Sequence, residues 1–402
     1  MKILTVDIGT GTQDIFLYDS RLDLENGLKL VMPSPTMMVH HQIQAATRLK
    51  EPVLLTGTIM GGGPSQWAAE AHLRAGLPVF ATPEAALTFN DELEIVKGMG
   101  IQVVSPDEAR QLPDAVRRLE LRDFDFLAIR GALEVFGVSL QDLTAAAVAV
   151  FDHGNAPPGY SDRQFRFDYL DRRIRAENRL SAFAYPAEQV PPILTRLQAV
   201  VSSARGLDAP LVVMDTAPAA VLGATFDPRV AERKHLLVAN IGNFHTLAFR
   251  LKAEDTGPVD GPTWRIEGVF EHHTGLIDRP RLEALLCALA DGSLQHADVF
   301  GDHGHGALVY EPEPLHLGEG DFDVAVTGPR RNMLRRNLLR GAADQASAHL
   351  SLRPYMAVPF GDMMIVGCFG LLAATADVLP ELGETICGSL QGRGGGTAPW
   401  DA

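Results

Sequence analysis

Two short turns that combine glycine with hydroxyl or amide side chains each follow a run of aliphatic and β-branched residues. The first turn is Gly9-Thr10-Gly11-Thr12, and the second is centred on Gly242. Glycine lets a backbone approach a phosphate closely, and successive N–H groups in a turn form a concave anion site. We interpret both turns as phosphate-binding hairpins. An ordinary hairpin turn stays the alternative at each place.

Two aspartates stand at the ends of predicted strands and could work with such turns. Asp7 closes the first strand, and Mg²⁺ prefers oxygen ligands such as a carboxylate or the waters that it holds. Asp215 follows a buried run at 210–214 and is the candidate base. The alternative for Asp7 is a side chain that is satisfied by nearby backbone.

Strands and helices must bring these residues to a common edge, and the hydrophobic pattern alternates between the two types. Three strands with a glycine-containing turn after the first open the chain, and the same order recurs near residue 235. Proline and glycine mark where elements begin or end. The pattern predicts strands at 2–8, 14–18, 27–32, 52–57, 78–81, 144–151, 210–214, 235–250 (strand, turn, strand), 264–270, 322–327 and 363–367, and helices at 64–75, 163–200, 218–225, 282–290, 330–341 and 369–378, before a flexible tail at 391–402.

Length and charge narrow the class of protein. The 402 residues suggest two or three domains, and 46% hydrophobic against 21% charged residues is typical of a globular protein. Asp and Glu number 50 against 35 Lys and Arg, a net charge of -15. This balance argues against nucleic acid and membrane surfaces as partners. Small molecules remain the expected partners, and a homodimer is left open.

Cysteine usage and the lack of long apolar runs indicate a cytoplasmic protein. Cys287, Cys368 and Cys387 are far apart, so neither a disulfide framework nor a cysteine-ligated iron–sulfur cluster is expected. The apolar run that ends at Asp7 is too short for a signal peptide. No uninterrupted apolar stretch approaches the roughly 20 residues that span a bilayer.

Four segments resemble the superfamily of actin, sugar kinases and heat-shock-chaperone ATPases. They are VDIGTGTQDIFLYD (6–19), MDTAPAAVLGA (214–224), LLVANIGNFHTLAF (236–249) and VAVTGPRRNML (324–334). They are similar to the two phosphate hairpins, the connecting helix and the adenosine-binding strand–glycine–helix of that superfamily. The resemblance implies an α/β fold with two ribonuclease-H-like, actin-like ATPase lobes and an interlobe cleft. The first lobe would be 1–226, with a helical insertion and the connecting helix, and the second 227–390.

The resemblance also implies ATP and Mg²⁺ as cofactors, with phosphoryl transfer to a small molecule or ATP hydrolysis as the reaction. Asp7 would hold the metal, and Asp7, Asp215, Glu271 and His273 are the catalytic candidates. Asn240 departs from the superfamily, which carries an acidic residue there, so a non-catalytic nucleotide sensor or scaffold is the alternative. The predicted nucleotide contacts are Gly9, Thr10, Gly11, Thr12, Asn240, Gly242, Asn243, His245, Thr246, Gly328, Arg330 and Gly367.

Taken as a whole, the chain is also similar to a prokaryotic family that is labelled pyruvate formate-lyase-activating enzyme. Activating enzymes of that kind are radical enzymes that need three clustered cysteines for an iron–sulfur cluster. The spacing of Cys287, Cys368 and Cys387 supplies no such cluster.

Histidines next to acidic residues suggest a further site. Glu271-His272-His273 follows the third strand of the second half, so it should emerge beside the Gly242 turn and contact substrate or metal. Structural hydrogen bonding is the alternative, and a metal-dependent enzyme built on these clusters is a third function. His303 and His305 are expected in a solvated loop. The predicted substrate contacts are Thr58, Gly61, Gly62, Gly63, Asp152, His153 and His272.

Arginine-rich stretches have two interpretations. Residues 163–179 could grip an anion, but acids within the same stretch favour an exposed helix face. Arg330 stands at a predicted helix start, where either phosphate or solvent would contact it. Gly61-Gly62-Gly63 before a helix is a candidate anion site, and it lacks the lysine of a P-loop.

Overall fold

The structure is a computed structural model that describes residues 1–254, 263–335 and 352–401. In these residues the strands form three sheets, two of six strands and one of four, which confirms the mixed α/β class. The chain divides into two compact units. The first unit is Met1–Leu17, Lys29–Asp162 and Tyr185–Thr216, and the second is Tyr18–Leu28, Arg163–Ala184 and Ala217–Ala402. The predicted loop at 255–262 lies outside the described residues.

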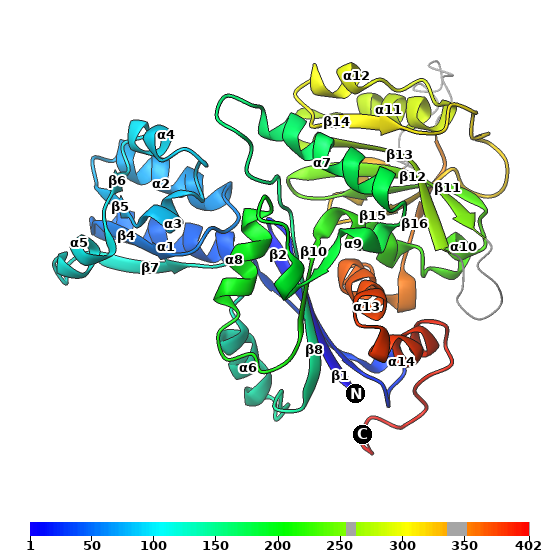
Figure 1. The fold of residues 1–402 in the computed structure, drawn as a ribbon, viewed down its shortest axis with the longest axis horizontal. Coiled ribbons are helices and arrows are strands. Elements are labelled where there is room, and N and C mark those ends of the chain that lie inside the picture. Colours follow the sequence, from blue (N-terminus) through cyan, green and yellow to red (C-terminus); the bar gives the residue numbers. More distant parts are fainter. Residues whose placement is uncertain (255–262, 336–351, 402) are drawn as a thin grey trace, which may run out of the picture. The chain divides into compact units, whose positions relative to one another are not determined.

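The larger sheet of the first unit has the order β3-β2-β1-β8-β10-β9 (Figure 1). β1 pairs with β8 and β8 with β10, both in parallel, so the carboxyl ends of these three strands lie at one edge. β8 carries the run LTAAAVAV, in which the small and β-branched side chains of residues 145–150 are fully buried. The strands are β1 (Lys2–Ile8), β2 (Thr12–Asp19), β3 (Leu28–Pro33), β8 (Leu143–Val150), β9 (Ala184–Pro186) and β10 (Leu211–Asp215).

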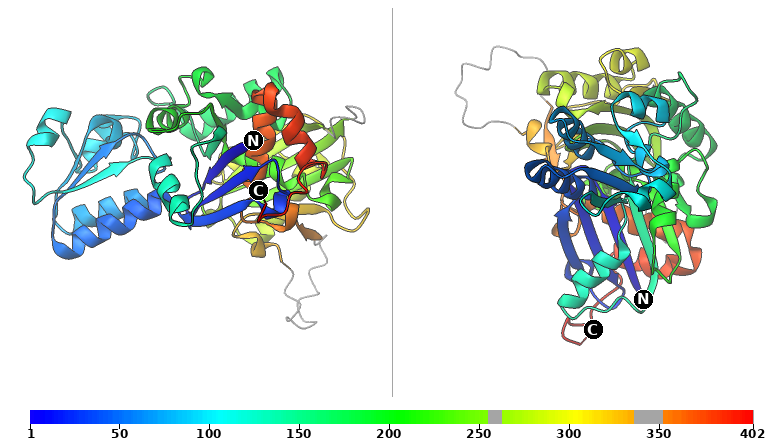
Figure 2. Two further views of the ribbon diagram at one scale, coloured as in Figure 1. Left: turned by 90° about the horizontal axis from the view of Figure 1, so that it is seen from below. Right: turned by 90° about the vertical axis from the view of Figure 1, so that its left-hand side faces the viewer.

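A four-stranded parallel sheet of order β6-β5-β4-β7 is inserted in the chain between β3 and β8. Helices α1 and α2 pack against each other beside it (Figure 2). The sequence analysis predicts a strand at 27–32 and no helix after it, so α1 is an addition of the structure. Ser34 is the N-cap, and its hydroxyl accepts from the N–H of Met37. The elements are β4 (Val53–Gly57), β5 (Val79–Ala81), β6 (Gln102–Val103), β7 (Arg117–Leu121), α1 (Pro35–Leu49), α2 (Pro64–Arg74), α3 (Pro83–Ala86), α4 (Leu93–Gly98) and α5 (Pro106–Gln111), and the first unit also holds α6 (Phe126–Val135) and α8 (Thr195–Ser203).

The sheet of the second unit has the order β14-β13-β12-β11-β15-β16. β11, β12 and β13 are antiparallel neighbours, and β15 and β16 continue in parallel from β11. This repeats the order β3-β2-β1-β8-β10 of the first unit, so the predicted recurrence of three opening strands is confirmed. The strands are β11 (His235–Ile241), β12 (His245–Glu254), β13 (Thr263–His273), β14 (Gly306–Val309), β15 (Val324–Thr327) and β16 (Pro354–Met356).

Two helices of the second unit cross at glycines. A Cβ atom on Gly223 would lie 1.8 Å from the carbonyl oxygen of Val366, and one on Gly370 would lie 1.9 Å from that of Ala219. Only glycine allows α9 and α13 to approach so closely. Among the described helices, none is both long enough and apolar enough to cross a membrane. The helices are α7 (Asp162–Ala176), α9 (Thr216–Ala224), α10 (Pro228–Ala231), α11 (Arg279–Asp291), α12 (His296–Phe300), α13 (Val366–Val378) and α14 (Pro380–Leu390).

Three sequence predictions are corrected. The predicted strand at 363–367 is wrong, because α13 begins at Val366, and a short apolar run is compatible with a buried helix as well as a strand. The helical stretch predicted at 163–200 is interrupted by β9. The helix predicted at 330–341 begins as a 3₁₀ turn, Arg331–Met333, and its part from residue 336 lies outside the described residues.

Candidate functional site

The carboxyl edge of the larger sheet in the first unit carries two aspartates on strands that flank β8. In register, Asp7 on β1 lies opposite Ala149, and Asp215 on β10 lies opposite Val150. The Thr216 hydroxyl donates to Asp7 Oδ1 over 2.6 Å. Burial raises the pKa of Asp7 to about 6; the bond from Thr216 opposes this rise, and the charge of Asp215 adds to it. A cation bound at this edge would therefore reduce the repulsion between the two carboxylates.

Asp152 lies at the same edge, just after β8, and it organises the loop that follows. Its two oxygens accept from the backbone N–H groups of Gly154 at 2.8 Å and Leu197 at 2.9 Å. Burial raises the pKa of Asp152, while these two bonds and the nearby Arg196 lower it. The side chain thus ties the loop to the first turn of α8. The neighbouring His153 packs its ring edge-on against Phe151, with ring centres 4.8 Å apart.

A partly buried ion pair that the sequence analysis did not predict supports the glycine-rich loop before α2. Arg196 Nε donates to Asp123 Oδ2 over 2.7 Å, and Asp123 Oδ1 accepts from the N–H of Gly61 at 3.1 Å. A Cβ atom on Gly61 would lie 2.6 Å from Arg196 Nη2, so the arginine occupies the space beside that glycine. No local signal marks this pair, because Asp123 and Arg196 are 73 positions apart in the sequence.

The rest of this loop is less constrained. A Cβ atom on Gly62 would meet the Thr88 carbonyl oxygen at 2.9 Å, whereas Gly63, with φ +60°, has open space beside it. Thr58 lies just after β4, and its hydroxyl is buried with no hydrogen-bond partner among the described residues. These residues lie between the carboxyl end of β4 and the start of α2.

The first glycine turn, which is predicted to bind phosphate, is held in place by the cap of α1. Ser34 donates its hydroxyl to the Thr10 carbonyl oxygen at 2.6 Å and its N–H to that of Gly11 at 3.1 Å. The Gly9 N–H donates to the Thr12 carbonyl oxygen at 2.9 Å and closes the turn. The loop between β1 and β2 is therefore fixed by its carbonyl groups.

The corresponding hairpin of the second unit carries an amide. Asn240 is the sixth residue of β11, as Asp7 is of β1, and it lies opposite Thr327 on β15. Gly328, with φ +92°, lies so close that its Cβ would be 2.6 Å from Asn240 Oδ1. The Thr327 hydroxyl is buried and has no hydrogen-bond partner among the described residues. Polar side chains therefore meet at the ends of β11 and β15.

The other predicted nucleotide contacts lie in different surroundings. Asn243 and Arg330 are exposed, whereas Thr246 is buried, with its hydroxyl 2.9 Å from that of Thr274. A Cβ atom on Gly242 would lie 2.7 Å from the carbonyl oxygen of His245, so the turn needs glycine. Gly367 is buried in the first turn of α13. It was predicted to stand at the end of a strand, but α13 already begins at Val366.

Glu271 pairs with a buried arginine. Arg166 Nε donates to Glu271 Oε2 at 3.0 Å and Nη2 donates to the same oxygen at 2.9 Å. Both side chains are almost fully buried, and His305 Nδ1 lies 3.2 Å from Glu271 Oε1. The exposed-face interpretation of residues 163–179 fits Arg175 but is wrong for Arg166, because α7 turns that side chain inward.

The histidines around Glu271 separate into exposed and buried members. His303 is exposed, as expected, but the solvated-loop prediction is wrong for His305, which is fully buried. His272 is buried, with Nδ1 3.1 Å from the carbonyl oxygen of His273. Burial lowers the pKa of His273 to about 4, and the nearby charges of His272, Arg163 and His303 add to this shift. His273 is therefore neutral near pH 7.

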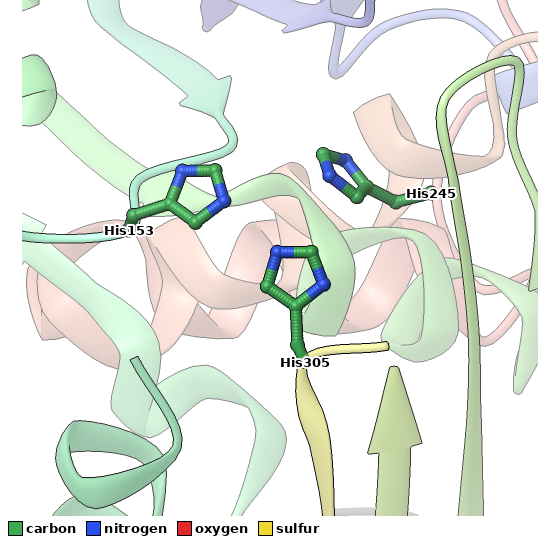
Figure 3. Close-up of side chains that lie close together, drawn as sticks. All are labelled: His153, His245 and His305. Carbon is green, nitrogen blue, oxygen red and sulfur yellow. The ribbon is translucent and has the colours of Figure 1, made fainter. Parts of the chain in front are cut away.

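Three imidazoles of the second unit lie at mutual contact distance. The ring centres of His245 and His305 are 5.0 Å apart, those of His273 and His305 are 4.6 Å apart, and those of His245 and His273 are 5.2 Å apart. A nitrogen of His245 lies within 4.8 Å of one of His305. Figure 3 shows these two rings reaching into the same space from the start of β12 and from the residue before β14.

A protein-family match places the chain among known sequences. Residues 60–333 match the family described as "Putative pyruvate format-lyase activating enzyme (DUF1786)". The chain belongs to this family. Cys287, Cys368 and Cys387 form no disulfide bond, and no described group with metal-ligand spacing contains a cysteine. The cysteines therefore do not fit the iron–sulfur cluster that radical activation requires.

No curated protein matches the sequence. A solved structure, described as that of an exopolyphosphatase-like protein, shares 11% identity with a TM-score of 0.22, and the match covers 75% of this chain and 57% of the other. The chain thus spans little more than half the length of that protein.

Proposed function

We propose that this protein binds ATP with Mg²⁺ and catalyses phosphoryl transfer to a small molecule or ATP hydrolysis. The observation that carries the proposal is the placement of Asp7 and Asp215 at the carboxyl ends of strands on either side of β8. Ligands of open α/β sheets bind at such edges. Carboxylate oxygens are suitable ligands for Mg²⁺, which binds nucleotide phosphates together with one or two of them.

The shared strand order of the two six-stranded sheets supports a finer fold assignment, also part of this proposal. Each sheet opens with antiparallel strands around a glycine turn and continues with parallel strands. This is the order that the resemblance to ribonuclease-H-like, actin-like ATPase lobes implies. In the proposal, the loop from Gly9 to Thr12 and the turn at Gly242 bind phosphates through backbone N–H groups.

The residues have separate roles in the proposed reaction. Asp7 holds Mg²⁺ directly or through water, and the cation stabilises its ionised form against the burial that raises its pKa. Asp215 is the candidate base that accepts the proton of the attacking hydroxyl or water. When bound, Mg²⁺ supplies charge neutralisation on the phosphates.

Calorimetry with ATP and Mg²⁺ tests the proposal, together with release of inorganic phosphate. Asp7→Asn and Gly242→Val should each weaken binding at least about tenfold, because one loses a cation ligand and the other blocks the phosphate turn. Asp142→Asn is the matched control: this aspartate is 63% exposed, pairs with Lys2 and stands before β8 rather than after it. The proposal is wrong if the wild-type chain does not bind ATP, or if all three variants bind as it does.

Asn240 favours a second candidate function, a nucleotide sensor or scaffold without turnover. An amide replaces the carboxylate at the strand end, and Gly328 packs directly against it. An amide can coordinate or hydrogen-bond, but it cannot position a water as a base. This candidate predicts ATP binding with no phosphate release, also in Asn240→Asp. Measurable turnover by the wild-type chain would exclude it.

A further inference from the structure

We infer that a cavity in the second unit binds a small organic zwitterion, a molecule whose anionic and cationic groups are separated by an apolar chain. The cavity lies at the amino end of β11 and has a volume of about 530 Å³. Binding sites for small molecules commonly measure about 300–1,000 Å³. Asn240 lies at the other end of the same strand, about 16 Å away at roughly 3.3 Å per residue, so the inference does not depend on ATP binding.

The strands give the cavity a basic side. Lys252 on β12 lies directly opposite His235 on β11 and Arg265 on β13, so three basic side chains occupy neighbouring positions on one face of the sheet. Lys252 and Arg265 carry like charges, and such pairs at opposite positions destabilise a sheet. Within the described residues, the ammonium group of Lys252 makes no ion pair or hydrogen bond. An anionic group bound beside Lys252 would offset this repulsion.

The segment that follows β14 gives the cavity an acidic side, which consists of Glu311, Glu313 and Glu319. Glu311 is half-buried, whereas Glu313 and Glu319 are exposed. Water screens an ion pair less where one partner is partly buried, so the cationic group of a ligand should bind most strongly at Glu311. The cavity therefore presents opposite charges from two different elements.

Two further carboxylates in the lining already have cationic partners. Arg250 Nε donates to Glu267 Oε2 at 3.0 Å, and Arg353 donates to the two oxygens of Asp323 at 2.8 and 3.1 Å. These carboxylates are thus neutralised by the protein itself. Lys252 and the three glutamates form no ion pair with any described residue. A ligand with a single charge would satisfy only one of the two sides, whereas a zwitterion satisfies both.

Arg250 also holds the basic and acidic sides together. Its side chain is buried, and Nη2 donates to the carbonyl oxygen of Glu313 at 2.6 Å. This bond ties the acidic segment to β12, two positions away from Lys252. A cavity that is already formed requires little ordering when a ligand binds, which favours affinity. Leu315 and Leu317 add apolar surface for the chain that joins the two charges of the ligand.

Calorimetry with ω-amino acids from β-alanine to ε-aminocaproate tests the inference, because this series increases the separation of the two charges. The single-charge controls are the alkyl carboxylates and alkylamines of the same lengths. The best ω-amino acid should bind wild type with a Kd of about 1 mM or lower. It should also bind at least about tenfold more tightly than either single-charge control, because each charged contact contributes separately.

Variants of the two sides should lose different parts of this binding. Lys252→Met should weaken the best ω-amino acid about tenfold or more and leave the alkylamine unaffected. Glu311→Gln should weaken the same ω-amino acid and leave the alkyl carboxylate unaffected. The matched controls are Glu384→Gln, an exposed carboxylate on α14, and Lys97→Met, a surface lysine of the first unit. Both controls should bind as wild type does.

Two further measurements keep the test decisive. Circular dichroism checks that each variant is folded; if Lys252→Met is not, Glu311→Gln decides the result. Asp7→Asn should leave the binding of the ω-amino acid unchanged, which separates this site from the proposed ATP site. The inference is overturned if no ω-amino acid binds more tightly than its single-charge controls, or if Glu384→Gln loses as much affinity as Glu311→Gln.

Discussion

The first strands of the two six-stranded sheets occupy the same topological position and differ most at one side chain. β1 reads KILTVDI and β11 reads HLLVANI, so Asp7 corresponds to Asn240. Around Asp7 the strand ends carry further carboxylates, Asp152 and Asp215, whereas around Asn240 the nearest partner in register is Thr327. A common strand order thus presents charged oxygen donors in one unit and a neutral amide in the other. The chemistry of each edge depends on these few side chains and not on the fold.

The two units also differ in how deeply they bury an arginine–carboxylate pair. Arg166 and Glu271 in the second unit are almost completely excluded from solvent. In the first unit, Arg196 keeps 17% of its side chain exposed while Asp123 is buried. Removal of one partner leaves an uncompensated charge, and the cost of that charge grows with burial.

The largest expected effect follows from this difference. Arg166→Met should lower the free energy of unfolding by about 3–5 kcal/mol, because Glu271 would stay buried without its partner. Arg196→Met should cost about 1–3 kcal/mol, since water can reach part of that site. Urea denaturation measures both values. The double change of Arg166 and Glu271 to Met should recover most of the loss, and equal costs for the two single arginine variants would contradict the comparison.

The second prediction concerns the two strand ends themselves. Asp7→Asn should lower phosphate release by at least about 100-fold, because the metal supplies several kcal/mol of charge stabilisation. Asn240→Ala should lower it only a few-fold, since the amide carries no charge. Steady-state phosphate release at saturating Mg²⁺ and ATP measures both. Similar losses in the two variants would show that the strand ends contribute alike.

The third prediction uses the raised pKa of Asp7. Mg²⁺ competes with a proton there, so Mg²⁺ affinity should fall about tenfold per pH unit below about pH 6. The folded state holds this proton more tightly than the unfolded chain. The carboxyl therefore destabilises the fold progressively as the pH rises from about 4 to 6. Calorimetric titration with Mg²⁺ between about pH 5 and 8 should show the fall in Mg²⁺ affinity for the wild type and not for Asp7→Asn. A wild-type Mg²⁺ affinity that does not change with pH would contradict the prediction.

The smallest expected effect distinguishes the two glycine turns. A Cβ atom on Gly242 would lie 2.7 Å from the His245 carbonyl oxygen, whereas one on Gly9 would have its nearest contact at 3.4 Å. Gly242→Ala should therefore lower the unfolding free energy by about 1 kcal/mol or more, and Gly9→Ala by less than about 0.5 kcal/mol. Thermal unfolding of the two variants provides the measurement. A larger loss of unfolding free energy in Gly9→Ala than in Gly242→Ala would contradict the prediction, because the turn at Gly9 would then tolerate a side chain less well.

Local patterns account for the elements that were predicted correctly. The β-branched runs correspond to β1, β10 and β11, and the helix predicted at 282–290 corresponds to α11. Asp278 caps this helix, because its side chain accepts from the Arg281 N–H. The strand predicted at 363–367 failed because a short apolar run has no period that separates a strand from a buried helix. α1 was missed although Ser34-Pro35 is a standard helix start.

By itself, the sequence determined the α/β alternation, the two glycine hairpins and the positions of Asp7, Asp215 and Asn240 at strand ends, because hydrophobic period and turn chemistry are local properties. Only the tertiary structure decided that Arg166 and His305 are buried and that Arg196 pairs with Asp123. Glu271 and Arg166 are 105 positions apart, and His245 approaches His305 only through the sheet. Such partners are selected by strand pairing and packing, and no local pattern encodes them.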